Sequence, residues 1–167
     1  GREPRWRLRP PAPAARPPLE KTTRDLLAVA KEWHGAADYV GHAWLEGERA
    51  IPPALLDSAR FEGCLKIDGR ANVLLAHVNG CGQLCGFEKK NKGFTGFASG
   101  GEKGLGGSND FDGDTVLVLA ESFIDMLSYA ALFPHDRTRY RSFGGGLSPK
   151  QPLIIREHIL ALPRGAD

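Results

Sequence analysis

The sequence predicts an α/β fold, with N-terminal helices and an antiparallel β-meander packed with a parallel α/β sheet. Three observations support this prediction: apolar residues recur at helical spacing in the first third of the chain, short segments rich in β-formers follow, and strands alternate with helices after that. Alternation of strands and helices is typical of a parallel sheet. At 167 residues the chain is long enough for one domain with its own core, or for two small modules that share one.

Residues 1–18 differ in composition from the rest of the chain. They hold five arginines, one glutamate and half of the prolines. Such a composition is typical of a solvated linker, although an arginine-rich arm can also contact phosphates without specificity. The net charge of the whole chain is only +2, so the remaining body is not that of a basic protein. We therefore divide the chain into a Pro/Arg-rich linker (1–18), a helical and β-meander domain (19–108) and an α/β domain (109–167).

The helices expected in the first half are indicated by spacing and by proline and glycine. Residues 19–35 carry apolar side chains near helical spacing and end in glycine, which stops helices readily. Residues 36–63 predict two short helices. The second begins at Pro52 or Pro53, where a missing N–H group costs nothing, and ends near Gly63.

Four short segments in the middle of the chain have the composition of β-strands and are separated by turn residues. We expect them to form an antiparallel meander of three or four strands over residues 64–68, 71–78, 82–90 and 93–99. The next stretch, SGGEKGLGGSNDFDGD (99–114), is dense in glycine and aspartate. We expect it to be a functional loop rather than a regular element.

The last third of the chain predicts a strand over 115–120, a helix over about 122–133, a strand over about 138–143 and a helix over about 148–162. The first strand, TVLVLA, is a nearly continuous apolar run, as in a central parallel strand that is buried on both faces. Glu121 follows at its carboxyl end, where open α/β sheets form their ligand crevices.

Two carboxylates after this strand are the first candidate site. Asp125 lies about one helical turn beyond Glu121, so both side chains can share the rim of one crevice. Carboxylate oxygens suit Mg²⁺, which usually takes only one or two ligands from protein. The alternative is structural: Ser122 or Glu121 caps the helix, and Asp125 is a solvated acid in its first turn.

The residues around Glu121 resemble a known family. An apolar strand that ends in glutamate, then SFID and an apolar helix, resembles the first motif of the Toprim domain, which bacterial-type primases, topoisomerases and related nucleases share. The segment RYRSFGGGLSPKQPLII (139–155) is similar to the strand, glycine turn and helix of primase-type Toprim domains. Residues 51–105 resemble the uncharacterised domain that precedes Toprim in proteins of plasmids and integrative elements, often near relaxases. The resemblance covers roughly residues 40–167.

This resemblance implies roles for both carboxylates. Glu121 would be the acid and base of phosphoryl chemistry and a Mg²⁺ ligand, and Asp125 matches the second acid of the motif, in a supporting role. The family also has an Asp-x-Asp pair that binds Mg²⁺ after the next strand. The sequence ends at LPRGAD, where that strand is expected to begin, and does not include the pair. We therefore expect the chain as given to be inactive by itself.

The expected function is Toprim-type processing of nucleic acid, primase-like or nuclease- or topoisomerase-like, in the DNA metabolism of plasmids or integrative elements. The expected partners are DNA or RNA in single-stranded form, together with relaxases or other mobilisation proteins. The alternative is a non-catalytic DNA-binding or protein-docking module with an incomplete Toprim fold. A zinc-dependent binding module is a third hypothesis.

Cys64, Cys81 and Cys85 bear on the zinc hypothesis. Structural zinc needs four ligands in tetrahedral array, and the sequence offers one C-x₃-C pair, with Cys85 inside a strand pattern. Small buried thiols are therefore favoured over zinc. The odd number of cysteines argues against a disulfide framework, and we expect a cytoplasmic protein.

Asp110, Asp112 and Asp114 alternate within NDFDGD and could in principle replace missing metal ligands. Their glycine and acidic neighbours do not fall where a calcium loop of the EF-hand type requires them. Asp and Gly are favoured in turns because of the backbone conformations that they adopt. The pattern favours a turn that leads the chain into the next strand.

A cluster of lysines and phenylalanines lies in FEKKNKGFTGFASGGEKG. Single-stranded nucleic-acid platforms combine phosphate contacts with stacking on aromatic rings, so the cluster is a candidate nucleic-acid site. The alternative is a β-hairpin with core phenylalanines and solvated lysines. The candidate binding residues are Lys89, Lys90, Lys92 and Lys103.

Membrane insertion is not expected, because no apolar stretch approaches the roughly 20 residues that a spanning helix needs. The basic N-terminal residues are not followed by the apolar region of a signal peptide.

Overall fold

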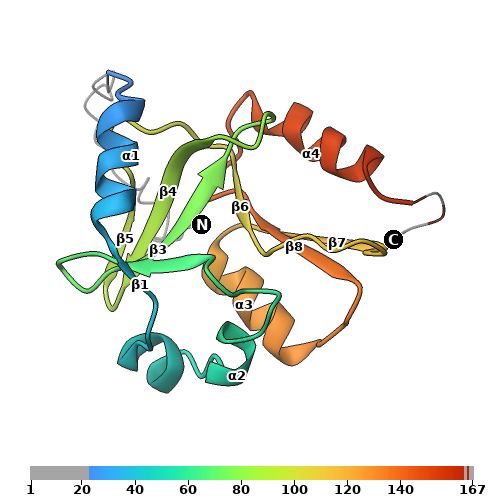
Figure 1. The fold of residues 1–167 in the computed structure, drawn as a ribbon, viewed down its shortest axis with the longest axis horizontal. Coiled ribbons are helices and arrows are strands. Elements are labelled where there is room, and N and C mark those ends of the chain that lie inside the picture. Colours follow the sequence, from blue (N-terminus) through green and yellow to red (C-terminus); the bar gives the residue numbers. More distant parts are fainter. Residues whose placement is uncertain (1–22, 164, 166–167) are drawn as a thin grey trace, which may run out of the picture.

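The computed structural model describes residues 23–163 and residue 165. The predicted linker, residues 1–18, lies outside them. The elements in chain order are α1 (Leu26–Gly35), β1 (Ala37–Asp38), the π-helical turn η1 (Trp44–Glu48), α2 (Pro53–Leu56), β2 (Leu65–Ile67), β3 (Val73–Val78), β4 (Leu84–Asn91), β5 (Phe94–Phe97), β6 (Leu105–Gly107), β7 (Val116–Ala120), α3 (Phe123–Leu132), β8 (Thr138–Ser142) and α4 (Gln151–Leu160) (Figure 1).

The strands of the described residues form one mixed eight-stranded sheet, and the predicted α/β class is confirmed. Its order is β1-β2-β3-β6-β8-β7, and β4 and β5 extend from β3. The pairings of β2 through β5 are antiparallel, as the meander prediction requires. Strands β7 and β8 are parallel and are joined through α3, which confirms the predicted strand–helix–strand unit.

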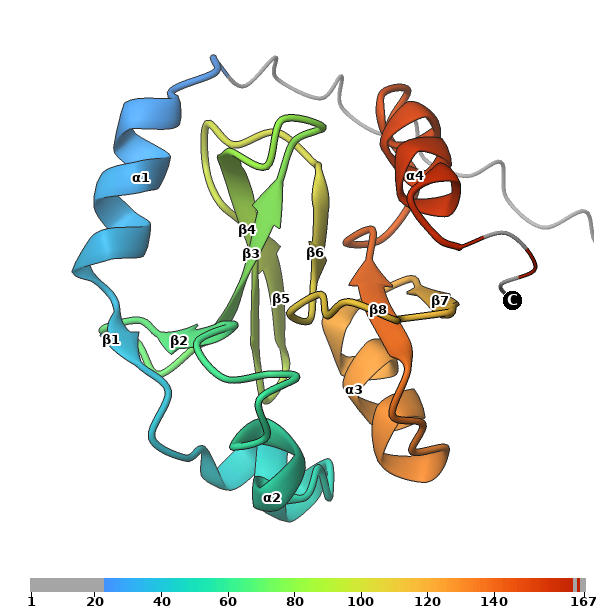
Figure 2. The same cartoon turned by 45° about the vertical axis from the view of Figure 1, so that its right-hand side comes forward.

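Helices cover both faces of the sheet. Helix α1 runs alongside β3 and β4 on one side of the molecule, whereas α3 lies against β7 and β8 on the other (Figures 1 and 2). Helix α1 begins where the Asp25 carboxylate accepts a hydrogen bond from the Ala28 N–H at 2.9 Å. This N-cap satisfies one of the free donors at the helix start.

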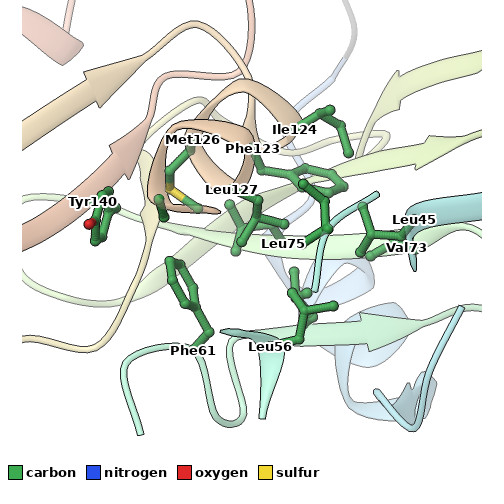
Figure 3. Packing of buried hydrophobic residues seen from close by; sticks show 13 residues of the cluster. Leu45, Leu56, Phe61, Val73, Leu75, Phe123, Ile124, Met126, Leu127 and Tyr140 are labelled. Atoms are coloured by element: carbon green, nitrogen blue, oxygen red, sulfur yellow. The ribbon is translucent and has the colours of Figure 1, made fainter. Parts of the chain in front are cut away.

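Two hydrophobic clusters lie on these faces, and β3 contributes to both. Val73 and Leu75 face α3, whereas Leu74 faces α1, because successive side chains of a strand point to opposite sides. Figure 3 shows the α3 side of this packing, with Phe123 and Leu127 directed toward the β3 residues. Each large side chain that is fully buried contributes roughly 1.5–3 kcal/mol. The buried residues of α3 are Phe123, Ile124, Met126, Leu127 and Ala130.

The prediction that residues 99–114 form a loop without regular structure is wrong for β6. This strand pairs with β3 on one side and with β8 on the other, so it joins the meander to the parallel unit. Its glycines permit this close packing: a Cβ atom on Gly107 would lie 2.3 Å from the Tyr140 carbonyl oxygen. Glycine here marks a close backbone approach rather than flexibility.

The prediction that the TVLVLA strand is central and buried on both faces is also wrong. Among the described residues, β7 pairs with β8 alone and ends the sheet. Val118 and Ala120 pack toward the α3 core, but Leu119 is 40% exposed on the opposite face. The apolar strand is therefore covered on one face only within the described residues.

Helix α2 is shorter than predicted. It starts at Pro53, as expected, but the residues that follow Leu56 form successive turns instead of continuing the helix to Gly63. The Ser58 hydroxyl donates to the Leu55 carbonyl oxygen at 2.6 Å, a local bond that competes with helix continuation.

No helix among the described residues is both long and apolar enough to cross a bilayer.

Candidate functional site

Glu121 and Asp125 lie at the junction of β7 and α3. Ser122 caps the helix: its hydroxyl donates to the Asp125 carboxylate at 2.7 Å and accepts from the Asp125 N–H at 3.4 Å. The capping role considered for Ser122 is therefore confirmed, and Asp125 is an acid in the first helical turn. Both acidic side chains are nevertheless exposed, and both line the same pocket. They remain accessible to a ligand while Ser122 fixes the backbone between them.

This pocket, which we call the Glu121 pocket, has a volume of about 410 Å³. It is formed by strands β4 and β5, by Lys103 before β6, by the start of α3 and by the glycine turn after β8. Its lining residues are Glu88, Lys90, Thr95, Gly96, Phe97, Lys103, Glu121, Ser122, Asp125, Gly144 and Gly145.

The structure separates the four candidate lysines. Lys90 and Lys103 line the Glu121 pocket, and the Lys103 ammonium donates to the Gly146 carbonyl oxygen at 3.0 Å. Lys89 points to the α1 face, where it pairs with Glu32. Lys92 pairs with Glu48 at 2.9 Å. The alternation of side chains along β4 explains why the neighbours Lys89 and Lys90 lie on opposite faces.

The phenylalanines of the same cluster have different environments. Phe87 is fully buried in the α1-side core, as the hairpin alternative expects, and Phe94 is 45% exposed. Phe97 lines the Glu121 pocket and meets the His77 ring edge-on, with ring centroids 5.1 Å apart. The pocket therefore has lysines and one aromatic ring on the meander side, and carboxylates on the α3 side.

The glycine turn after β8 is bonded directly to Glu121. The Gly145 N–H donates to the Glu121 carbonyl oxygen at 2.7 Å. Gly144 and Gly145 both have positive φ angles, 67° and 89°, which residues with a side chain rarely adopt. The turn predicted from SFGGGL thus supports the backbone of the candidate acid.

A buried carboxylate forms the floor of the pocket, and the sequence did not indicate it. Glu88 is 2% exposed and accepts hydrogen bonds from the Ser142 hydroxyl and from the Phe123 N–H at 3.2 Å, and one of its carboxylate oxygens lies 3.1 Å from His77 Nε2. In sequence, Glu88 shares a strand face with Gly86 and Lys90 and resembles part of a solvated surface. Only the packing of α3 and β8 over this face buries it.

Two of the three aspartates of NDFDGD, Asp110 and Asp114, form ion pairs with arginines. Asp114 accepts two bonds from Arg60, at 2.7 and 2.8 Å, and one from Arg139 at 3.2 Å. Burial alone would raise the pKa of Asp114, but the bonds from Arg60, the Phe111 N–H and Arg139 outweigh it and lower this pKa to about 2. The predicted turn is confirmed, because the Asp114 N–H donates to the Phe111 carbonyl oxygen.

The three cysteines are free thiols. Cys85 is buried, as predicted for a small core thiol, and burial raises its pKa to about 11. Burial also raises the pKa of Cys64 to about 11, and Cys81 is exposed. Within residues 23–163, no three His, Cys, Asp or Glu side chains converge in a way that could hold a metal ion.

Part of the chain matches a known protein family. Residues 43–110 match the model of a family described as a protein of unknown function (DUF3991). This segment contains η1, α2 and strands β2 to β6, and so includes His77, Glu88, Lys90 and Lys103 but neither Glu121 nor Asp125. Neither a curated protein nor a solved structure matches the chain significantly.

Proposed function

We propose that this protein takes part in Toprim-type phosphoryl transfer on nucleic acid, in the DNA metabolism of plasmids or integrative elements. One observation carries the proposal: Glu121, at the carboxyl end of β7, shares a pocket with Lys90 and Lys103 from the meander side. Two lysines can bind a phosphate group, and an acid in the same pocket can transfer the proton that the reaction of this phosphate requires.

Each group has a distinct task in this proposal. The ammonium groups of Lys90 and Lys103 bind backbone phosphates, and Phe97 offers an aromatic surface at the same pocket. The exposed Glu121 carboxylate takes or gives the proton of the reacting nucleotide oxygen. Ser122 restrains Asp125, which supports the Glu121 side of the pocket.

The Glu121 and Asp125 carboxylates have the hard oxygen donors that Mg²⁺ prefers, and Mg²⁺ needs only one or two of them from protein. Glu121 is the proposed protein ligand. Mg²⁺, when bound, supplies positive charge that stabilises the charge developing on the phosphate.

The proposed compartment is the cytoplasm, where the three thiols stay reduced. Single-stranded DNA or RNA is the proposed partner, and relaxases or other mobilisation proteins are further candidates from the resemblance.

The second candidate function is a non-catalytic DNA-binding or protein-docking module. One observation favours it: Lys90, Lys103 and Phe97 line the pocket, and phosphate contacts and base stacking on them need neither an acid nor a metal ion. Asp110 and Asp114 are bound to arginines, so neither is free to bind a metal ion. Nucleic-acid binding and catalysis therefore need separate tests.

The binding test compares two double variants with equal charge change. Lys90→Ala with Lys103→Ala removes both pocket lysines, whereas Lys89→Ala with Lys92→Ala removes two lysines that pair elsewhere. Affinity for a fluorescent 20-nucleotide oligo-dT is measured between 50 and 300 mM NaCl. We expect the first pair to reduce the slope of log affinity against log salt by about 1.4, because each single-strand phosphate contact contributes about 0.7.

The second pair serves as the matched control and should leave the slope unchanged. Equal slopes for both double variants and the parent protein would remove the Glu121 pocket as the nucleic-acid site. Circular dichroism and thermal unfolding of each variant ensure that only folded proteins are compared.

The catalytic test replaces Glu121 with glutamine, which keeps the size of the side chain and removes its acid and base function. Primer synthesis and single-strand cleavage are assayed with Mg²⁺ or Mn²⁺. We expect Glu121→Gln to lower any such activity by at least about 100-fold, as for loss of a general acid–base group. Equal activity of parent and variant would reject the catalytic role of Glu121. Absence of activity in the parent, together with binding that depends on Lys90 and Lys103, would favour the non-catalytic module.

A further inference from the structure

We propose that Glu88 is a positioning residue of the Glu121 pocket. Its buried carboxylate binds both the start of α3 and the end of β8, and so holds these two segments in place relative to each other. This inference rests on the proposed function, because it concerns the arrangement of the same pocket. Glu88 belongs to β4, whereas both segments that it holds belong to the strand–helix–strand unit.

The bonds of Glu88 reach both walls of the pocket. One carboxylate oxygen accepts from the Ser142 hydroxyl at the end of β8 and lies 3.1 Å from Nε2 of the His77 ring. The other accepts from the Phe123 N–H at 3.2 Å, the first N–H group of α3. A carboxylate at a helix N-terminus is stabilised by the free N–H groups there. Glu121 and the glycine turn lie two residues away from these two contacts.

Small residues make room for this arrangement. Strand pairing places Gly86, His77, Gly106, Ser142 and Ala120 in one row across five strands. His77 thus has glycine on both sides. A Cβ atom on Gly106 would lie 2.9 Å from the His77 ring, and one on Gly86 would lie 2.5 Å from the Phe97 ring. The glycines let Phe97 cover His77 and let Glu88 reach Ser142.

The hydrogen bonds of His77 fix its orientation. Its Nδ1 lies 2.9 Å from the Gly104 carbonyl oxygen, and since a carbonyl oxygen only accepts, Nδ1 carries a proton. Gln151, the first residue of α4, donates to the same carbonyl oxygen at 2.6 Å and to that of Phe143 at 2.8 Å. The network therefore extends from β3 and β4 to the start of α4.

Glutamine can keep a hydrogen-bonded contact to each of the three groups around Glu88, whereas alanine keeps none. With its oxygen toward the Phe123 N–H, a glutamine amide can donate both protons, to Ser142 Oγ and to Nε2 of a neutral His77. Glu88→Ala instead leaves a cavity and unpaired buried groups. If Glu88 acts by position, Glu88→Gln should behave like the parent protein and Glu88→Ala should not.

The experiment has two readouts, both on variants whose folded fraction is known from urea unfolding. The first is amide hydrogen exchange of Phe123 and Gly145, whose N–H groups bond to Glu88 and to the Glu121 carbonyl. We expect Glu88→Ala to accelerate exchange at both amides by about tenfold or more. The amide of Leu74, the β3 residue whose side chain faces α1, should stay protected. The second is affinity of the folded fraction for 20-nucleotide oligo-dT, which should weaken at least about tenfold in Glu88→Ala and stay within about twofold in Glu88→Gln.

Phe61→Leu is the matched control for stability, because it weakens the core without touching the pocket. It should leave the affinity of the folded fraction unchanged. If Glu88→Ala does not fold, Ser142→Ala removes one of the bonds to Glu88 and keeps the carboxylate; it should accelerate exchange at Gly145 and weaken binding.

Three outcomes overturn the inference. The first is an unchanged affinity in folded Glu88→Ala, or in folded Ser142→Ala if Glu88→Ala does not fold. The second is an equal loss of affinity in Glu88→Gln and Glu88→Ala, which would assign the role of Glu88 to its charge. The third is an acceleration of hydrogen exchange that is spread evenly over the molecule. If the two pocket lysines prove irrelevant to binding, the proposed function fails instead. In that case the exchange data alone decide whether Glu88 holds the two segments together.

Discussion

Asp114 illustrates how far a single residue can be understood from its neighbours in sequence. Its position in NDFDGD indicated a turn, and the turn is present. Its partners were not predictable, because Arg60 is distant in sequence and Arg139 lies on β8, beyond β7 and α3. The side chain is 2% exposed, so these partners are screened little by solvent. The ion pairs fix the entry to β7 against the turns that follow α2.

Asp114 also gives a pH dependence of stability. Its pKa falls from 3.8 to about 2 on folding, so the unfolded chain binds the proton more readily. The stabilisation is complete above about pH 5 and is lost as the pH falls through about 2, with a size of about 2 kcal/mol. Urea unfolding between pH 2 and 6 should show a steeper loss for the parent than for Asp114→Asn. Asp112→Asn, at an exposed neighbour, should keep the parent slope.

Glu88 represents the opposite case at this scale. No periodicity or motif indicated it, since a glutamate between phenylalanine and lysines is ordinary in an exposed strand. Lys90 was indicated together with Lys89, although only one of them lines the Glu121 pocket. For both residues the deciding fact is which face of β4 another element covers.

At the scale of elements, caps and periodicity were reliable where the signal was local. Strand β7, helix α3 and strand β8 lie within a few residues of their predicted bounds, because an apolar run, a serine cap and a second β-rich run are local features. Helix α2 stops early because a serine hydroxyl bonds to the local backbone. Strand β6 was missed because glycine is rare in strands unless two backbones approach closely.

The glycines of β6 can be tested directly. Gly107→Ala would place a Cβ atom 2.3 Å from the Tyr140 carbonyl oxygen, which belongs to the backbone and cannot move aside by rotation of a side chain. We expect a loss of about 3 kcal/mol or more in the free energy of unfolding. Gly69→Ala is the control, since nothing lies within 4 Å of its added Cβ. A loss below about 0.5 kcal/mol for Gly107→Ala would contradict the close packing described for β6.

For the whole molecule, the main feature is that one sheet runs through both predicted domains. Strand β6 ends at Gly107, next to the boundary drawn at residue 108, and pairs with β3 before it and β8 after it. The Glu121 pocket forms at this junction, with lysines from one side and carboxylates from the other. A site of this kind needs both parts of the chain, which explains why its members are scattered in sequence.

The sequence by itself determined the α/β class, the antiparallel meander, the strand–helix–strand unit and the position of Glu121 after β7. These features depend on side-chain periodicity and on caps, which act over a few residues. The tertiary structure alone decided that β6 joins the two halves and that β7 lies at the edge of the described sheet. It also decided that Lys90 and Lys103 line the same pocket as Glu121, and that Glu88 is buried at this pocket. These depend on which strands pair and which faces are covered, and those contacts link residues that are far apart in the chain.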